Sequence, residues 1–203
     1  EADGALTLET ESPTNNGHYT INNNGTLNVE KGMVGNTSPA SGVCYVINNN
    51  AGGTVNVSGG SVVATNHIVI RQVSFSATGE NTVNVTGGTI SGLRAVWIHL
   101  AGSDASVAPT VNLTVSGGTL VAQENSNSDK VAIYSYNDGN SLANVTIDIS
   151  GGMMDGCVWV GGGTTKTASE TVTVTGGDME DLYSYAGASV AAGKVVVYGG
   201  KFR

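Results

Sequence analysis

The chain has 203 residues, among them 30 Gly and only 3 Pro, and its charged residues make up 12%, about half of the usual share of about 25%. The formal net charge is −8 and the Lys and Arg residues are scattered, which excludes nucleic acid and anionic membranes as partners because both need a basic surface. No stretch approaches the roughly 20 apolar residues of a membrane span, so we expect no membrane insertion. The polar residues are mostly Asn, Ser and Thr, and this composition is typical of strands and turns.

A short segment recurs seven times along the chain. Its clearest copy is residues 82–88, Thr-Val-Asn-Val-Thr-Gly-Gly, and the others are residues 26–32, 54–60, 112–118, 146–152, 171–177 and 194–200. Successive second glycines lie 28, 28, 30, 34, 25 and 23 residues apart. Each copy alternates apolar and polar residues, which indicates a strand with one buried face. The glycines indicate a corner that requires positive φ.

Two further strands complete each repeat. An apolar residue stands two positions after every corner, as Val62, Ile90 and Leu120 do, and marks a second strand. A third strand is expected at residues 43–47, 67–71, 95–100, 131–136, 156–160 and 182–185. Three short strands in a repeat of about 25 residues predict an all-β fold, a right-handed single-stranded parallel β-helix (solenoid) of about seven coils. We expect residues 1–203 to form one such domain.

This pattern resembles the pectin-lyase-like superfamily of right-handed parallel β-helices, especially the β-helix domains of secreted and cell-surface bacterial proteins. The resemblance covers nearly the whole chain, but it is one of architecture and fixes no activity. It implies an extracellular or bacterial cell-surface location and contact with polymers or host surfaces. Because the chain begins without Met and ends just after a corner, we expect a fragment of a longer surface protein. We also expect it to be a monomer.

The third strand contains most of the aromatic residues. If Val46, Ile68, Ile70, Val96 and Ile98 point inward, their neighbours, Val69 among them, point outward. The outward side chains that we predict to form a binding face are Tyr45, Arg71, Trp97, His99, Tyr134, Tyr136, Trp159, Tyr183 and Tyr185. The strand that contains Val69 and Arg71 has no aromatic residue. We expect this strand to separate Tyr45 from the other rings.

Two alternatives to a binding face remain open. The rings could point inward, although that orientation would expose paired β-branched residues such as Ile68 and Ile70. The rings could also point outward and only stack on one another, which stabilises a sheet by about 0.2–1 kcal/mol per pair. An exposed apolar row is unfavourable unless something covers it, and Tyr and Trp suit contact with sugar rings or with a protein partner.

The sequence contains no catalytic motif of the superfamily. Lyases of the superfamily use Ca²⁺ held by carboxylates with an arginine base, and its hydrolases use clustered aspartates. The outward column at residues 28, 56, 84, 114, 148, 173 and 196 contains a single carboxylate, Asp148, and the acidic residues 178–181 are expected to form a solvated turn. Residues 124–129 and 138–140 offer oxygen ligands for Ca²⁺ without EF-hand spacing. We therefore predict no enzyme activity and no cofactor.

The two cysteines, Cys44 and Cys157, stand four coils apart in the predicted solenoid. At about 4.8 Å per coil, they are too distant for a disulfide, which needs Cα atoms within about 7 Å. Free thiols are expected.

Three classes of function remain. The first is a non-catalytic module that binds a polysaccharide or a glycoprotein glycan along the aromatic strand. The second is an adhesin or immune-interaction domain that binds a host protein, such as immunoglobulin, through the same face. A lyase or hydrolase fragment and a purely structural stalk are less favoured.

Overall fold

The computed structural model describes residues 5–8, 18–36, 42–74, 79–100, 108–124, 130–137, 143–163, 169–184 and 194–203. Over these ranges the regular structure is all β, with 22 strands, parallel pairing throughout and no helix. The strands form three sheets, which we name A, B and C.

Each sheet takes every third strand of the chain. Sheet A contains, in spatial order, β1 (Ala5–Leu8), β4 (Met33–Asn36), β7 (Ser61–Ala64), β10 (Thr89–Gly92), β13 (Thr119–Ala122), β16 (Met153–Asp155), β19 (Asp178–Met179) and β22 (Lys201–Phe202). Sheet B contains β2 (Tyr19–Asn23), β5 (Tyr45–Asn49), β8 (Ile68–Ser74), β11 (Arg94–Leu100), β14 (Val131–Asn137), β17 (Cys157–Gly163) and β20 (Leu182–Ser184). Sheet C contains β3 (Thr26–Val29), β6 (Thr54–Val57), β9 (Glu80–Val85), β12 (Thr110–Val115), β15 (Asn144–Ile149), β18 (Ser169–Val174) and β21 (Lys194–Val197).

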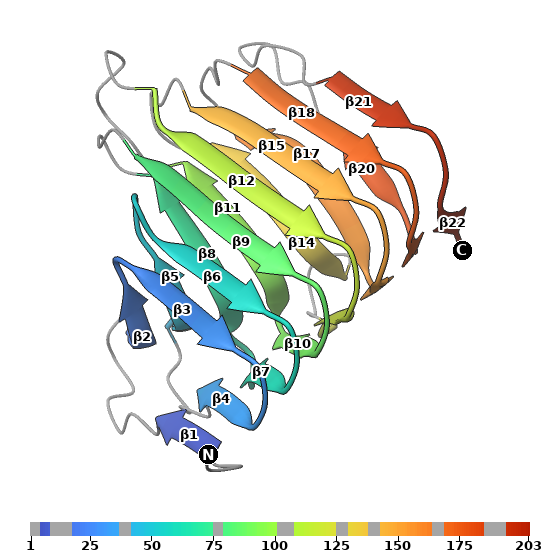
Figure 1. Ribbon diagram of the computed structural model, residues 1–203. Coiled ribbons are helices and arrows are strands. Elements are labelled where there is room, and N and C mark those ends of the chain that lie inside the picture. Colours follow the sequence, from blue (N-terminus) through green and yellow to red (C-terminus); the bar gives the residue numbers. More distant parts are fainter. Residues whose placement is uncertain are drawn as a thin grey trace.

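The strand order in every sheet follows the order of the sequence, so the chain advances by one coil each time it passes through sheets B, C and A (Figure 1). Neighbouring coils pair residue by residue at equivalent repeat positions. Val55, for example, pairs with Leu27 on one side and with Val83 on the other. The predicted parallel β-helix of about seven coils, with three short strands in each, is confirmed.

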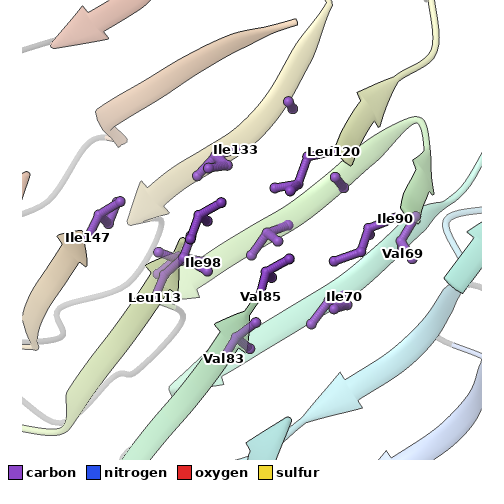
Figure 2. Packing of buried hydrophobic residues seen from close by; sticks show 14 of the residues in the cluster. Val69, Ile70, Val83, Val85, Ile90, Ile98, Leu113, Leu120, Ile133 and Ile147 are labelled. Carbon is purple, nitrogen blue, oxygen red and sulfur yellow. The ribbon is translucent and has the colours of Figure 1, made fainter. Parts of the chain in front are cut away.

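The inward-facing columns form one continuous apolar core. Sheet C contributes Val83 and Leu113, sheet A contributes Ile90 and Leu120, and sheet B contributes Ile98, all at most 1% exposed. Figure 2 shows side chains from the three sheets meeting in the interior. Because each coil is too thin to bury these residues alone, stability comes from stacking neighbouring coils.

Six of the seven corners have two glycines, the first corner having Lys31 before Gly32. The two glycines serve different purposes, and Gly117 and Gly118 illustrate both. Gly118 has a φ of +77°, as predicted for the corner. Gly117 is restricted by space instead, because a Cβ there would overlap the carbonyl oxygen of Thr86 on the preceding coil and lie 3.1 Å from its carbonyl carbon. The stacked corners therefore approach one another more closely than any side chain allows.

Asparagine side chains form ladders between coils, as the Asn runs at residues 22–24 and 48–50 suggest. Inside the solenoid, Asn23 donates to Asn49 and Asn49 donates to Asn81, both at 2.7 Å. On the outside of sheet C, Asn84 donates to Asn56 at 2.9 Å. The inner ladder satisfies amide groups that are otherwise costly to bury.

The alternation predicted for sheet B is wrong at the beginning of β5, β8, β11 and β14. Val69 and Ile70 both belong to the core, as do the equivalent pairs Val46–Ile47, Ala95–Val96 and Ala132–Ile133, and Figure 2 shows Val69 among the core side chains. Ile68 is buried but lies outside that core, in register with Tyr45 and Arg94. Two consecutive inward residues mark the corner where the chain enters sheet B. The residue before each pair is consequently moved to the outer side.

Cys44 and Cys157 are not joined by a disulfide and both are buried, as the predicted coil separation requires. Burial raises the pKa of the Cys44 thiol, and a backbone hydrogen bond with His18 opposes the change. A buried thiol of this kind behaves as a small apolar side chain.

Candidate functional site

The outer side of sheet B holds Arg71 and four of the predicted aromatic residues in one lateral column, whereas Tyr45 pairs with Ile68 outside that column. Consecutive pairings run from Arg71 to Trp97, from Trp97 to Tyr134, from Tyr134 to Trp159 and from Trp159 to Tyr183. His99 and Tyr136 pair in a second column beside the first. We call the residues Tyr45, Arg71, Arg94, Trp97, His99, Tyr134, Tyr136, Trp159 and Tyr183 the aromatic face. Tyr185 lies outside the described residues, as do residues 125–129 and 138–140.

One end of the aromatic face is tightly packed around Arg71. Its guanidinium carbon lies 4.7 Å from the centre of the Tyr45 ring and 5.5 Å from that of Trp97. The Tyr45 and Trp97 rings are stacked, with centroids 6.2 Å apart. The expected gap between Tyr45 and the other rings is therefore absent, because the rings approach across the intervening coil and Arg71 lies against both.

His99 completes this packed end. Its ring stacks on Trp97 with centroids 4.0 Å apart and an interplanar angle of 11°. Arg71 donates from Nε at 3.1 Å to His99 Nδ1, and its Nη2 lies 2.7 Å from the same atom. Since a guanidinium can only donate, Nδ1 is the accepting nitrogen of a neutral imidazole in this arrangement.

The opposite end of the aromatic face is more open. Tyr134 stacks on Tyr136 with centroids 5.5 Å apart, and it meets Trp159 edge to face at 6.0 Å. Trp159 and Tyr183 follow with centroids 5.8 Å apart and a tilt of 44°. These contacts have the offset and edge geometries that aromatic quadrupoles favour.

Exposure differs between the two ends. Tyr45 and His99 are buried, at 6% and 8% exposure, so the prediction that they are exposed is wrong. Trp97, Tyr134, Tyr136 and Trp159 are half-buried, and Tyr183 is 44% exposed. The accessible ring surface therefore lies toward β14, β17 and β20.

Arg94 joins the two ends and was missed as a site residue from sequence. Its guanidinium carbon lies 4.2 Å from the centre of the Tyr134 ring and 6.0 Å from that of Trp97. Strict alternation places Arg94 on the inner side with Val96, but the inward pair Ala95–Val96 shifts it to the outer side. The sequence could have revealed the outward position of Arg94 only if the break in alternation at Ala95 had been recognised.

The electrostatics of this face differ from those of the whole chain. The seven strands of sheet B contain Arg71, Arg94 and His99 but no Asp or Glu. Burial lowers the pKa of Arg94, which the nearby Tyr134 opposes. Burial also raises the pKa of the Tyr134 phenol, with Arg94 opposing the change. The face is thus locally basic in a chain of net charge −8.

Both indole nitrogens on the face lack a hydrogen-bond partner in the described part of the chain. Trp97 Nε1 and Trp159 Nε1 are each shielded from solvent, with less than 1 Å² accessible. A buried donor left unpaired costs about 1–3 kcal/mol.

The acidic residues predicted to form a solvated turn are partly ion-paired. Asp178 contacts Lys201 at 3.4 Å and Arg203 at 2.6 Å, across neighbouring coils of sheet A. Within the ranges that the structure describes, no group of three or more His, Cys, Asp or Glu side chains is arranged to hold a metal ion. The aromatic face is the strongest candidate site among these residues.

No protein-family model, curated protein or solved structure matches the chain. Among the described residues, no helix is long and apolar enough to cross a membrane.

Proposed function

We propose that the chain is a non-catalytic binding module of an extracellular or surface-attached bacterial protein, and that its aromatic face recognises a glycan. The observation that supports this most is the run of Tyr134, Trp159 and Tyr183, which come from three consecutive coils and lie in lateral register. Rigid, amphipathic rings at regular intervals suit contact with successive sugar units of a chain. The extracellular location rests on the resemblance to secreted β-helix domains.

The rigidity of the rings supports a binding role. Each half-buried ring already contacts a neighbour, so little side-chain entropy remains to be lost when a ligand binds. Tyr183, with 44% of its surface exposed, offers accessible ring surface at the open end of the face. An exposed apolar ring is unfavourable in the free chain, and a ligand that covers it removes this cost. The rings therefore stabilise a complex more than they stabilise the free chain.

A glycan array probed with the intact chain tests this function, alongside Trp159→Ala and Tyr183→Ala variants. We expect both variants to weaken binding by at least about tenfold, the effect of losing one central aromatic contact. Tyr198→Ala is the matched control, because Tyr198 is 77% exposed and follows β21, away from sheet B. Equal weakening in the control, or no binding to any glycan, would contradict the proposal.

A host protein is the second candidate partner. The packed end supports it, since Tyr, Trp and Arg are the residue types enriched at the centres of protein interfaces and Arg71 lies between Tyr45 and Trp97. Purified host proteins, immunoglobulin among them, immobilised in parallel with the glycans separate the two partners. Binding to protein after removal of its glycans would favour the second candidate.

Enzyme activity requires a separate measurement. Incubation of the chain with polysaccharides that it binds, with and without added Ca²⁺, should release neither reducing ends nor unsaturated products. Steady release of either product would replace the binding function by a lyase or hydrolase function.

A further inference from the structure

Arg94 is a partly buried cation that has no counter-ion among the described residues. Its guanidinium is packed against the Tyr134 ring at 4.2 Å, and the structure gives it no hydrogen bond or ion pair with any described residue. An arginine at a protein surface normally binds a carboxylate or remains fully hydrated. Arg94 binds no carboxylate among the described residues. It is also not fully hydrated, because burial is the main cause of its lowered pKa.

The described groups that Arg94 contacts on this face are the neutral rings of Tyr134 and Trp97, and neither supplies a negative charge. No Asp or Glu occurs in the strands of sheet B, and among the described residues the face meets a carboxylate at Tyr183, whose hydroxyl lies 3.5 Å from Asp181. A ligand that complements this surface must supply acceptors and negative charge.

We infer that the glycan bound by the aromatic face carries an anionic substituent, a carboxylate or a sulfate ester, that pairs with Arg94 above the Tyr134 ring. This inference rests on the proposed function and specifies its ligand class. A guanidinium offers parallel N–H donors to two oxygens of a carboxylate or sulfate, and the ring beneath it fixes its plane. Arg94 is then the residue that separates acidic from neutral glycans.

The net charge of −8 does not oppose such a ligand at close range. At physiological ionic strength, exposed charges are screened over about 8 Å. The acidic residues on other sides of the solenoid therefore act weakly at Arg94, whereas the guanidinium itself acts at contact distance. Acidic repulsion elsewhere disfavours polyanions that do not reach this position.

Backbone-matched polysaccharides test the inference. The probes are dextran, carboxymethyl-dextran and dextran sulfate, together with hydroxyethyl cellulose, carboxymethyl cellulose and cellulose sulfate. Each is titrated against the intact chain and the variants Arg94→Gln, Arg94→Lys and Lys194→Gln. Lys194 is the control because it is an exposed cation on β21 of sheet C, so its replacement changes the net charge by the same amount. Circular dichroism verifies that each variant is folded.

We expect the anionic form of at least one backbone to bind at least about tenfold more tightly than its neutral form, as one charge-assisted contact predicts. Arg94→Gln should abolish that preference, Arg94→Lys should retain part of it, and Lys194→Gln should leave it unchanged. The carboxymethylated and sulfated arms show which anion is preferred. Equal affinity for neutral and anionic forms, or a preference that survives Arg94→Gln, would overturn the inference and leave the proposed glycan binding intact. An equal loss in Lys194→Gln would reduce the effect to net charge. Absence of binding to every probe and every glycan of the array would overturn both.

Discussion

Replacing Gly117 by Ala tests the interpretation that coil spacing at the corners is limited by backbone contact. The new methyl group would overlap the carbonyl oxygen of Thr86 on the preceding coil, and it would lie 3.1 Å from the carbonyl carbon of the same residue. Both partners are backbone atoms of stacked coils, so no side chain can rotate away. The two coils must separate locally.

The expected cost follows from the bonds on either side of the corner. Separation weakens the hydrogen bonds from Ser116 N to Val85 O and from Thr119 N to Gly88 O, both 2.9 Å long. Each contributes about 0.5–1.5 kcal/mol, and overpacking adds about 1–3 kcal/mol. We therefore expect Gly117→Ala to lower the free energy of unfolding by about 2–6 kcal/mol, a large share of the total of about 5–15 kcal/mol for a domain.

Urea denaturation followed by far-ultraviolet circular dichroism measures this loss. Gly25→Ala is the matched control, because a Cβ at Gly25 has no neighbour within 4 Å and its φ is not positive, so a change within about 0.5 kcal/mol is expected. Hydrogen exchange should locate the weakening at the two coils that meet at Gly117. If both variants lose the same stability, close approach of the backbone does not explain the first glycine of the corner.

Three further predictions concern buried polar groups and the packed end of the aromatic face. Glu170 is 4% exposed, and burial raises its pKa, although hydrogen bonds from Ser135 and Gly161 oppose the rise. Its folded-state pKa therefore lies above the unfolded value of about 4.3, so its contribution to stability is full below that pH and is lost as the pH rises through the folded pKa. Denaturation across this window should show the decline in the native chain and a flatter profile in Glu170→Gln; parallel profiles would contradict the assignment. Asn49→Ala should cost about 1–3 kcal/mol in chemical denaturation because it interrupts the buried ladder, whereas Asn24→Ala, which removes an exposed bond to Asn50, should cost less than about 0.5 kcal/mol. Arg71→Met should make the Trp97 indole more accessible to acrylamide in a Trp159→Phe background, because the guanidinium lies 5.5 Å from the Trp97 ring; unchanged quenching would show that Arg71 does not cover it.

The repeat made most of the fold predictable. Inward columns such as Leu113 and Ile147 follow from period-2 alternation, and the positive φ of Gly118 follows from its place in a corner. In a regular solenoid, equivalent positions of each coil have the same environment. Seven copies therefore reveal the pattern of buried and exposed positions even where one copy departs from it. The aromatic column was predictable for the same reason.

Other features depended on contacts that no single strand reveals. Alternation cannot show that Val69 and Ile70 both point inward, because a corner breaks the period of two. Arg94 was missed through this break. The burial of Tyr45 and His99 depends on Arg71, whose side chain packs between elements of different coils. Long side chains that lean across a coil are invisible to a rule based on backbone register.

The broken alternation bears on whether sheet B serves only to stabilise the solenoid. A purely structural coil gains most by directing each large apolar side chain inward, as sheet C does with Leu113 and Ile147. Sheet B instead places Tyr45, Ile68 and the half-buried rings on its outer side, with Arg71 and Arg94 against them. Placing these side chains on the outer side loses part of the stability that core burial would give. The cation–π contacts recover some of it, since each contributes about 0.5–2 kcal/mol. The indole donors of Trp97 and Trp159 remain unpaired in the described chain, and a phenylalanine at either position would avoid that penalty. Departures from local rules of this kind tend to occur at functional sites, which is why variants of this face should be assayed for binding before stability.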